Sequence, residues 1–401
     1  MRRFLLLLSC VPFLAASAQT EPQPPSRFES TVVDERTHQP LPMSSVHVSK
    51  SSSTIANIDG SFTIACDSDD VLHISYVGYQ PLQVKARHLP TQVKLKGLSF
   101  GLQEVTVRPI SETIRQTTKE TLRQLQKHRN KKAMFFYRQT AFSDTLCYEF
   151  AEAFLKGHSA AWLRDLELLT GRFAGIQPDS MHHYSYYGNF FTFSQIEVAT
   201  KDELKNIGKA DLLPLSRYYT RFYDVDYEII THDEGRLYAI HFTPKPEVKR
   251  PILEATLYVD EATHHLRRIE GTGRNIRVLQ KEKGIVNGKV RMLREVFNTE
   301  YRYIVNMTET RGFLEVQSVF VDECHEMHGK QITTRSLLFN LGDQKAKKGQ
   351  PLKYFSKLQQ QINEQGYDPK FWKDNEVVRR TPVEQQVMQL FEQQNLFGVF
   401  K

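Results

Sequence analysis

The sequence is poor in cysteine and lacks long apolar runs after its first residues. Cys66, Cys147 and Cys324 are widely spaced, and none belongs to a C-x-x-C pair. The fourth cysteine, Cys10, lies in the N-terminal stretch that we expect to be removed, so the mature chain keeps an odd number of isolated thiols. This argues against a disulfide framework and against a zinc or redox site, and we expect three buried thiols. No run beyond residue 14 reaches the ~18 apolar residues of a membrane-spanning helix, and no transmembrane span is predicted.

Signatures of common enzyme and nucleic-acid-binding classes are also missing. The chain has no phosphate-binding G-x-x-x-x-G-K-[ST] loop, no G-x-S-x-G elbow and no G-x-G-x-x-G fingerprint. The formal charge of +7 falls to +5 when Arg2 and Arg3 are removed with a leader, and no dense basic run occurs. The sequence therefore predicts a protein without catalytic residues, cofactor, metal or nucleic-acid partner, with weak attraction at most to anionic lipid or polysaccharide.

The N-terminus has the pattern of a secretory signal. Arg2 and Arg3 precede an apolar stretch over residues 4–14, and Ala-Ser-Ala at 16–18 offers a small-x-small cleavage site. We expect the mature chain to begin near Gln19. The alternative is a lipoprotein modified at Cys10, because residues 7–10 faintly resemble a lipobox. The prediction is an exported protein, either soluble in the periplasm or peripherally associated with the outer membrane.

The composition is that of a globular protein rich in β structure. With 401 residues the chain can form two or three domains. Charged residues make up 25%, apolar residues 40%, and the mean hydropathy is −0.46, which is ordinary for a globular chain. Aromatic residues at 11% favour strands, since Tyr and Phe pack well on a pleated surface.

Short alternating runs between turn residues predict a β-sandwich over residues 28–107. Asp59-Gly60 is a strong hairpin signal, and the acidic residues at 67–70 form a second turn. Gly78, between two tyrosines, is suited to positive φ. The apolar side chains that alternate with polar ones are Phe62, Ile64, Leu72, Ile74 and Tyr76, which predicts antiparallel strands with one buried face.

This stretch resembles the carboxypeptidase regulatory-like domain, a prealbumin-like sandwich, most closely the version at the N-termini of exported Bacteroidetes proteins. The matching residues are Thr37, Pro40, Leu41 and Pro42; Asn57, Asp59, Gly60 and Phe62; Ser75, Tyr76, Gly78 and Tyr79; and Leu102, Glu104, Val105 and Val107. Met43 departs from the pattern, because the family commonly has glycine there. The resemblance covers about a fifth of the chain and implies an accessory module without catalytic residues, so it implies no peptidase.

The rest of the chain predicts a helix, a large sheet and a helical tail. Helical spacing of Ile114 and Leu122 indicates a helix within 108–130, which either joins two domains or packs on the sheet; Ser111 and Thr113 are N-cap candidates. Repeated strand patterns predict an antiparallel β-rich domain over 131–342, in which the strands after residue 219 form a long meander. The tail, 343–401, contains amphipathic helices at 355–365 and 383–394, and Phe371 and Trp372 anchor the intervening joint (367–378) to the sheet. The predicted order is signal peptide 1–18, linker 19–27, sandwich 28–107, helix or linker 108–130, sheet 131–342 and helices 343–401; the fold class is mainly β.

Several residue groups are candidate sites, and each also has a simpler structural interpretation. They are His325 with His328; the pairs His182-His183 and His264-His265; Asp67, Asp69 and Asp70; the aromatic run Tyr184, Tyr186, Tyr187, Phe190, Phe191 and Phe193; and the glycosylation-like triplets at 144–146 and 179–181. The first histidines are i and i+3 where a zincin helix needs i and i+4, and adjacent histidines in a strand point to opposite faces. The acidic residues fit a turn, and an aromatic run at strand spacing is typical of a core.

Three functional classes follow from these observations. The leading hypothesis is a non-enzymatic cell-envelope protein that binds an envelope protein, lipid or glycan. One alternative is a LolA-like lipid or lipoprotein carrier with an apolar cavity, because residues 252–271 resemble one hairpin of such half-barrels. The other is a hydrolase whose site forms only in three dimensions.

Overall fold

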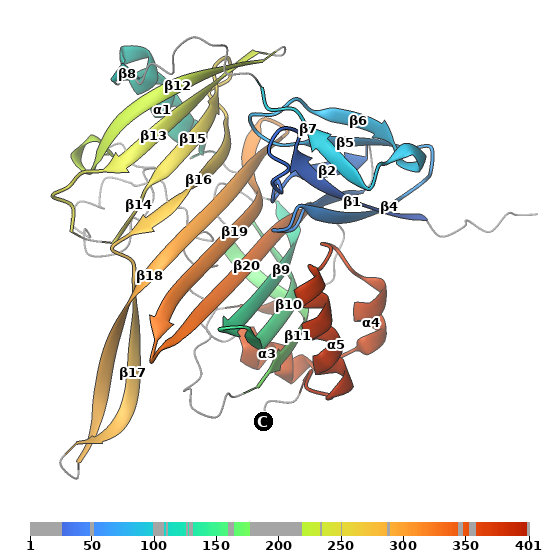
Figure 1. Cartoon of the computed structure of the whole chain (residues 1–401), viewed down its shortest axis with the longest axis vertical. Coiled ribbons are helices and arrows are strands. Elements are labelled where there is room, and N and C mark those ends of the chain that lie inside the picture. Colours follow the sequence, from blue (N-terminus) through green and yellow to red (C-terminus); the bar gives the residue numbers. More distant parts are fainter. Residues whose placement is uncertain are drawn as a thin grey trace, which may run out of the picture.

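The computed structural model describes residues 26–48, 52–98, 108–109, 111–125, 127, 131–158, 164–176, 219–232, 235–249, 251–286, 289–343, 348–352 and 358–398. The fold is mainly β, as the sequence predicts: two small N-terminal sheets, a large antiparallel sheet and C-terminal helices (Figure 1). The small sheets and the last two helices lie beside each other on one face of the large sheet (Figure 1).

The N-terminal unit is a two-layer sandwich with its own core. Its elements are β1 (Ser26–Asp34), β2 (Ser45–Val48), β3 (Ser53–Ile55), β4 (Ser61–Cys66), β5 (Val71–Ser75), β6 (Leu82–Lys85), the 3-10 turn η1 (Ala86–His88) and β7 (Gln92–Leu95). One sheet has the order β4-β1-β7 and the other β3-β2-β5-β6. Val32, Val46, Phe62, Leu72 and Val93 are fully buried between them.

One strand pair of the sandwich contradicts the predicted antiparallel arrangement. β1 and β7 are parallel, with Thr31 opposite Gln92. The reason is that β6 belongs to the second sheet, so the chain crosses through η1 before it enters the first sheet as β7. A strand that arrives by such a crossover is not constrained to the antiparallel direction of a hairpin.

The turns of the sandwich follow the sequence signals. Gly60 has φ +77°, and a Cβ there would collide with the carbonyl oxygen of Val32. Gly78 has φ +85°, as predicted. Met43 also has a positive φ, +64°, and its side chain is buried against the large sheet. The departure from the glycine of the family pattern therefore places an apolar side chain at the contact between two units.

The large sheet joins two consecutive runs of strands. Its strands are β8 (Arg108–Pro109), β9 (Lys132–Ser143), β10 (Leu146–His158), β11 (Arg164–Gly175), β12 (Tyr223–His232), β13 (Gly235–Pro244), β14 (Ile252–Leu253), β15 (Ala255–Asp260), β16 (Leu266–Arg274), β17 (Arg277–Val286), β18 (Lys289–Thr310), β19 (Phe313–Met327), β20 (Lys330–Gly342) and β21 (Gln350–Pro351). Neighbours run β21-β11-β10-β9-β20-β19-β18-β16-β15-β13-β12-β8, while β14 pairs with β16 and β17 with β18. The predicted meander is confirmed: β12, β13, β15, β16, β18, β19 and β20 follow one another in the sheet as they do along the chain. The earlier strands join it through β9, which pairs with β20.

Alternation along the strands gives the sheet two covered faces. In β9, Phe135 and Tyr137 share a core with α1 (Glu112–Leu125) and α3 (Leu358–Gln365). The amide of Ile114 donates to Ser111 Oγ at 3.3 Å, which caps α1, and the helix buries Ile114 as predicted. Of the two roles predicted for this helix, the structure shows packing on the sheet. A short 3-10 turn, η3 (Tyr219–Arg221), adds Tyr219 to the same core.

Two C-terminal helices pack on the opposite face with the sandwich. They are α4 (Pro369–Asp374), capped by Asp368, and α5 (Pro382–Gln393), which begins with a capping box between Thr381 and Glu384. Helix α4 lies within the segment predicted as a joint, because Asp368-Pro369 is itself a helix start. The predicted anchor is confirmed, since Trp372 packs against Phe154 on the sheet. Among the described helices, none has both the length and the apolar character required to cross a membrane.

Candidate functional site: a buried arginine–glutamate cluster beside a pocket

The residues weighed from the sequence do not gather into one site. His325 is buried at the end of β19, and His328 lies in the following turn with φ +52°. His264 is a turn residue with φ +57°, while Nδ1 of His265 lies 3.0 Å from Glu309. The histidines at 182–183, the aromatic run at 184–193 and the triplet at 179–181 lie outside the described residues. In the described part of the chain, no three His, Cys, Asp or Glu residues are grouped so as to hold a metal ion.

The acidic turn and the cysteines have structural surroundings. Asp70 accepts a hydrogen bond from the amide of Asp67 at 3.0 Å, which is the turn that the sequence predicts. Burial raises the pKa of the Cys66 thiol to about 11, and burial also raises that of Cys147 to about 12. Such thiols hold little thiolate near neutral pH and are poor nucleophiles. Cys324 is only half-buried, so the prediction of three buried thiols is wrong at this position.

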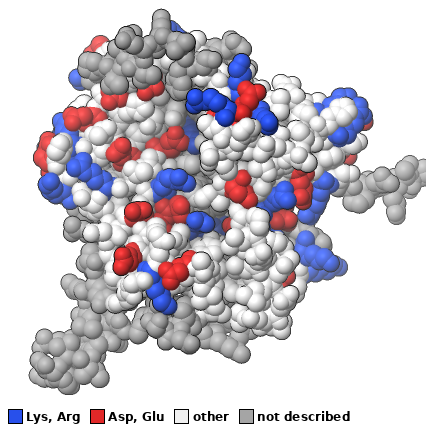
Figure 2. Space-filling model, in the orientation of Figure 1, with Lys and Arg blue, Asp and Glu red and all other residues white. Residues whose placement is uncertain are grey.

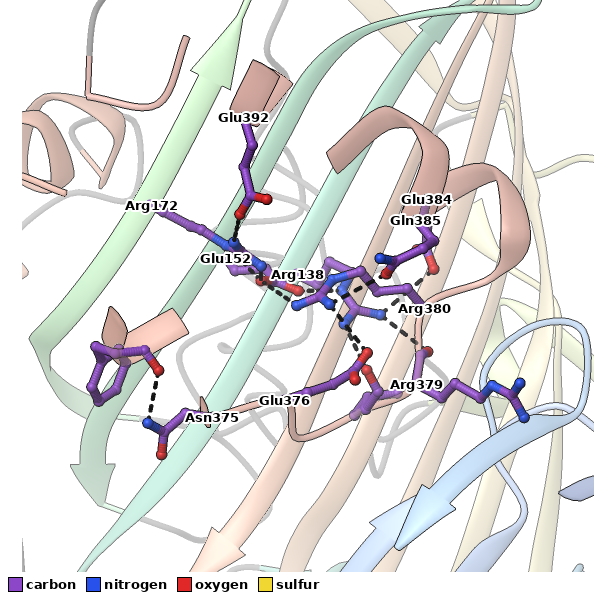
Figure 3. Close-up of polar contacts among 12 residues, drawn as sticks. Arg138, Glu152, Arg172, Asn375, Glu376, Arg379, Arg380, Glu384, Gln385 and Glu392 are labelled. Carbon is purple, nitrogen blue, oxygen red and sulfur yellow. Dashed lines mark hydrogen bonds and ion pairs between the residues drawn. The ribbon is translucent and has the colours of Figure 1, made fainter. Parts of the chain in front are cut away.

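The charged centre of the molecule is Glu152, on the face of β10 that is covered by the helices. Its side chain is 1% exposed, and three guanidinium groups surround its carboxylate. Arg138 Nε donates at 2.7 Å, Arg172 donates through Nε at 2.8 Å and Nη2 at 2.5 Å, and Arg380 Nη2 lies 3.4 Å away. Figure 3 shows these arginines converging from two strands and from the segment before α5.

Arg138 is the best satisfied of the three arginines. Besides its bond to Glu152, Nη2 donates to the carbonyl of Val378 at 2.7 Å and Nη1 to that of Arg379 at 3.3 Å. Nη1 also lies 3.5 Å from Glu384, the carboxylate of the α5 capping box. Arg138 therefore fixes the connection between α4 and α5 onto the sheet.

The same connection holds the sandwich. Thr54 Oγ1 donates to the carbonyl of Val377 at 2.9 Å, and Asn57 Nδ2 donates to the carbonyl of Arg379 at 2.9 Å. The guanidinium of Arg379 pairs with Glu29 of β1 at 2.9 Å. Figure 2 shows Lys and Arg alternating with Asp and Glu along this boundary between sandwich and helices. Residues 377–380 thus connect three parts of the molecule through backbone carbonyls and ion pairs.

Arg172, on β11, is enclosed by aromatic rings. Its guanidinium carbon lies 4.8 Å from the centre of the Trp372 ring, 5.2 Å from that of Phe397 and 5.6 Å from that of Phe150. Such cation–π contacts stabilise a guanidinium that has lost water. Its guanidinium also interacts with the hydroxyl of Tyr367, and Nη1 lies 3.5 Å from Glu392 at the surface of α5.

Arg380 is the least satisfied of the three arginines. Nη1 lies 3.1 Å from Glu376 and donates weakly to Gln385 at 3.5 Å, while the one contact of Nη2 within the described part of the chain is with Glu152, at 3.4 Å. Its Nε is buried and has no hydrogen-bond partner among the described residues. The side chain is only 7% exposed, so water at the outer surface does not replace the missing partner.

The electrostatics of the cluster keep its charges fixed. Burial alone would raise the pKa of Glu152, but the charges of Arg172, Arg380 and Arg138 outweigh it and hold the pKa well below the usual range. Burial works against the charge of Arg380, yet Glu152 and Glu376 raise its pKa above the ordinary value. A carboxylate that stays ionised and guanidinium groups that stay protonated exchange no protons near neutral pH. The arrangement suits binding and structural support.

A pocket opens beside Arg172 and Arg380, between α4, α5 and the end of the described chain. Its volume is about 610 Å³, within the usual range for sites that bind small molecules. It is lined by Arg172, Tyr367, Pro369, Trp372, Lys373, Glu376, Arg380, Gln385, Met388, Glu392, Asn395 and Phe397. The indole Nε1 of Trp372 is buried there without a hydrogen-bond partner among the described residues.

Sequence reasoning missed this cluster, although one signal was present. In β10 the residues on the helix-covered face are Phe150, Glu152 and Phe154, so a carboxylate interrupts an apolar face. A charge at such a position requires a buried partner of opposite sign. The sequence does not identify the partner, because Arg380 is 228 residues away along the chain.

A second hollow of about 720 Å³ lies between the sandwich and the large sheet. At its base, Arg268 Nη2 donates to the hydroxyl of Tyr76 at 2.6 Å and to Glu270 at 2.6 Å, with its guanidinium carbon 4.4 Å from the centre of the Tyr76 ring. Tyr258 donates to the other oxygen of Glu270 at 2.8 Å. Because the donors of this group are well partnered, it serves as a second attachment of the sandwich.

Comparisons with known proteins identify the family of the N-terminal sandwich but not that of the rest of the chain. No curated protein gives a match to the chain. A LolA superfamily protein of Nitrosomonas europaea is similar at 9% identity and a TM-score of 0.20, covering 55% of this chain and 91% of that one. A chain of the MucA/MucB complex of Pseudomonas aeruginosa is similar at 6% identity and a TM-score of 0.20, and the match covers 57% of this chain and 94% of that one. Neither structure assigns a function at these values. The family model of the CarboxypepD_reg-like domain matches residues 29–107, so the chain contains a CarboxypepD_reg-like domain at its N-terminal sandwich.

Proposed function

We propose that the protein is a non-enzymatic binding protein of the cell envelope, in which the sandwich and the C-terminal helices are fixed on one face of the large sheet and frame a ligand pocket. The observation that carries the proposal is the Glu152 cluster. It joins the sheet to the connection before α5, which in turn holds the sandwich, and two of its arginines line the pocket. The segment at 1–18, with the pattern of a secretory signal, supports export.

The chemistry of the described residues supports binding rather than catalysis. Glu152 stays ionised, so it cannot act as a general acid near neutral pH. Cys66 and Cys147 are thiols with raised pKa, and burial lowers the pKa of His325, which lies on the opposite face of the sheet. None of these groups is positioned as a nucleophile beside the pocket.

The lipid-carrier alternative predicts an apolar cavity lined by strands of the large sheet, one face of which is covered by α1 and α3. Buried side chains from both helices and from many strands fill that face among the described residues. The pocket beside Arg172 lies on the opposite face. The carrier and hydrolase hypotheses therefore stay predictions, without an observation that favours either.

Two measurements test the proposal. Cell fractionation of the source organism carrying the tagged full chain is expected to recover the protein in the envelope, and recovery in the cytoplasm contradicts it. Native mass spectrometry of the envelope-released protein is expected to show an added mass that is lost in Met388→Trp, which fills the pocket. The matched control is Val383→Trp on the 52%-exposed side of α5, which is expected to keep the added mass. Retention of that mass in Met388→Trp, or no added mass in the unmodified protein, contradicts a ligand in this pocket.

A further inference from the structure

The pocket beside the Glu152 cluster contains two buried hydrogen-bond donors that the described residues leave unused. Arg380 Nε and Trp372 Nε1 both belong to lining residues, and both atoms are buried. A buried donor without an acceptor destabilises the fold, because it has lost its hydrogen bond to water and gained none in return. Two of them in residues that line one pocket point to an acceptor bound there, which each side chain reaches by a small movement.

The three arginines around Glu152 differ in how many of their nitrogens remain able to donate a hydrogen bond to a ligand. Arg138 uses all three of its nitrogens and makes two bonds of 2.7 Å. Within the residues that the structure describes, Arg380 has no polar contact shorter than 3.1 Å, and its Nε has no hydrogen-bond partner. Arg172 is bound to Glu152 by two nitrogens, and its guanidinium also meets the Tyr367 hydroxyl and, at 3.5 Å, Glu392. Arg380 and Arg172 therefore present donors to the pocket, whereas Arg138 is committed to the structure.

The lining carries one more positive charge than negative, and Glu152 already pairs with both arginines, so an anion here competes with carboxylates for the guanidinium groups. Arg172, Arg380 and Lys373 face two carboxylates, Glu376 and Glu392. Glu392 contacts Arg172 at 3.5 Å and is 43% exposed at its side chain, so this contact is weak and easily replaced. A ligand oxyanion that forms shorter, charge-assisted bonds to the guanidinium groups would gain more than the lost contact provides.

The other walls of the pocket favour an apolar body. They include Pro369, Trp372, Met388 and Phe397. Rings from two of these residues, Trp372 and Phe397, also flank the Arg172 guanidinium. A volume of about 610 Å³ accommodates a small organic molecule with both parts.

We propose that this pocket binds a small organic anion, with its carboxylate or phosphate group on Arg380, Arg172 and the indole N–H of Trp372, and its apolar part against Met388 and Phe397. The inference rests on the proposed function only in taking this pocket as the ligand site. It does not depend on where in the cell the protein is located.

Isothermal titration of the purified full chain with four probes tests the chemistry. Octanoate and octyl phosphate carry the anionic group on an apolar chain, octanamide is the neutral counterpart, and acetate has the anion without the chain. We expect octanoate or octyl phosphate to bind at least tenfold more tightly than octanamide and acetate. The tighter of the two anions then identifies carboxylate or phosphate as the preferred group. Equal binding of octanamide overturns the proposal, and so does the absence of binding by both anions.

Matched variants locate the binding. Arg380→Gln removes the free donor and its charge, and we expect about a tenfold loss of affinity for the tighter anion. Arg379→Gln removes the same charge from the next residue, whose side chain pairs with Glu29 outside the pocket, and is expected to change the affinity less than twofold. Equal losses in both variants would mean that only the general charge matters, and would overturn the assignment.

A third variant keeps the test valid where Arg380→Gln destabilises the fold. Trp372→Phe retains an aromatic ring beside Arg172 but removes the indole N–H, and we expect a loss of about threefold for the anions and none for octanamide. Unchanged anion affinity in this variant removes Trp372 from the site and overturns the proposed geometry. If the anions do not bind but the native protein carries an added mass that disappears in Met388→Trp, the anion is rejected and the proposed function stands. If the anions do not bind and the native protein carries no added mass, the anion and the ligand pocket of the proposed function are both rejected.

Discussion

The interior of the sandwich and its contact with the large sheet contain different kinds of residue. Between its two sheets the sandwich packs aliphatic residues such as Val32, Val46 and Leu72, together with Phe62. The contact with the large sheet is aromatic and lies beside buried ions: Met43 and Ile55 of the sandwich meet Phe and Trp side chains next to the Glu152 cluster.

This difference explains how each region behaves. An apolar core tolerates rearrangement as long as volume is conserved. A buried ion cluster requires fixed geometry, because every charge that loses its partner is strongly destabilising. Contacts between domains of one chain ordinarily allow relative motion. We infer that the ion cluster holds the sandwich and the helices in one orientation, whereas the sandwich core maintains only the sandwich.

The largest effect is expected from Glu152→Ala. This variant leaves three buried guanidinium groups around an empty position and should lower the free energy of unfolding by about 3–5 kcal/mol. Urea unfolding followed by tryptophan fluorescence measures it, since Trp372 lies beside the cluster. The control is Glu29→Ala, which breaks the exposed pair with Arg379 and should lower stability by less than about 1 kcal/mol. Equal losses in the two variants would refute the central role of Glu152.

A smaller and local effect is expected from Ile74→Ala in the sandwich core. Ile74 is fully buried in β5, and its truncation should lower stability by about 3 kcal/mol. Hydrogen exchange is expected to accelerate in β2 and β5 while β10 stays protected. The Glu152→Ala variant should show the reverse, with faster exchange in β10 and α5. The same exchange pattern in both variants would contradict the separation of the two regions.

The sequence predicts the sandwich better than it predicts the Glu152 cluster, because the sandwich depends on residues close together in sequence and the cluster on residues far apart. Gly60 and Gly78 are required by local turns, and Ile114 by the face of one helix, so short windows of sequence reveal them. The parallel pair of β1 with β7 and the pairing of β9 with β20 depend on the path of the chain. Strand alternation shows that Glu152 is buried, but no local pattern selects Arg172 or Arg380 as its partner.

The pH dependence of stability should report the cluster directly. The pKa of Glu152 is lowered in the folded protein from an ordinary value of 4.5, so between the two values the unfolded chain binds more protons. The stabilisation is complete above 4.5 and is lost progressively as the pH falls toward the lowered value. The difference in unfolding free energy between the unmodified protein and Glu152→Gln should therefore shrink below pH 4.5. Urea titrations at pH 7, 5, 4 and 3 measure it, and a constant difference would contradict the lowered pKa.

The smallest effect concerns Met43, where the two regions meet. Its φ of +64° is unfavourable for any residue with a Cβ, yet its side chain packs against the sheet. Met43→Ala and Met43→Gly both remove that packing, but only glycine relieves the backbone, so we expect Met43→Gly to be the more stable by about 0.5–1 kcal/mol.

The same pair of substitutions at Val46, in the extended strand β2, should give the opposite order, because glycine weakens a strand. Thermal unfolding of the four variants measures both differences. A reversed order at Met43 would mean that its backbone is not strained there. The expected order would show that the chain accepts strain at a position where the family pattern commonly has glycine, because the methionine side chain attaches the sandwich to the sheet.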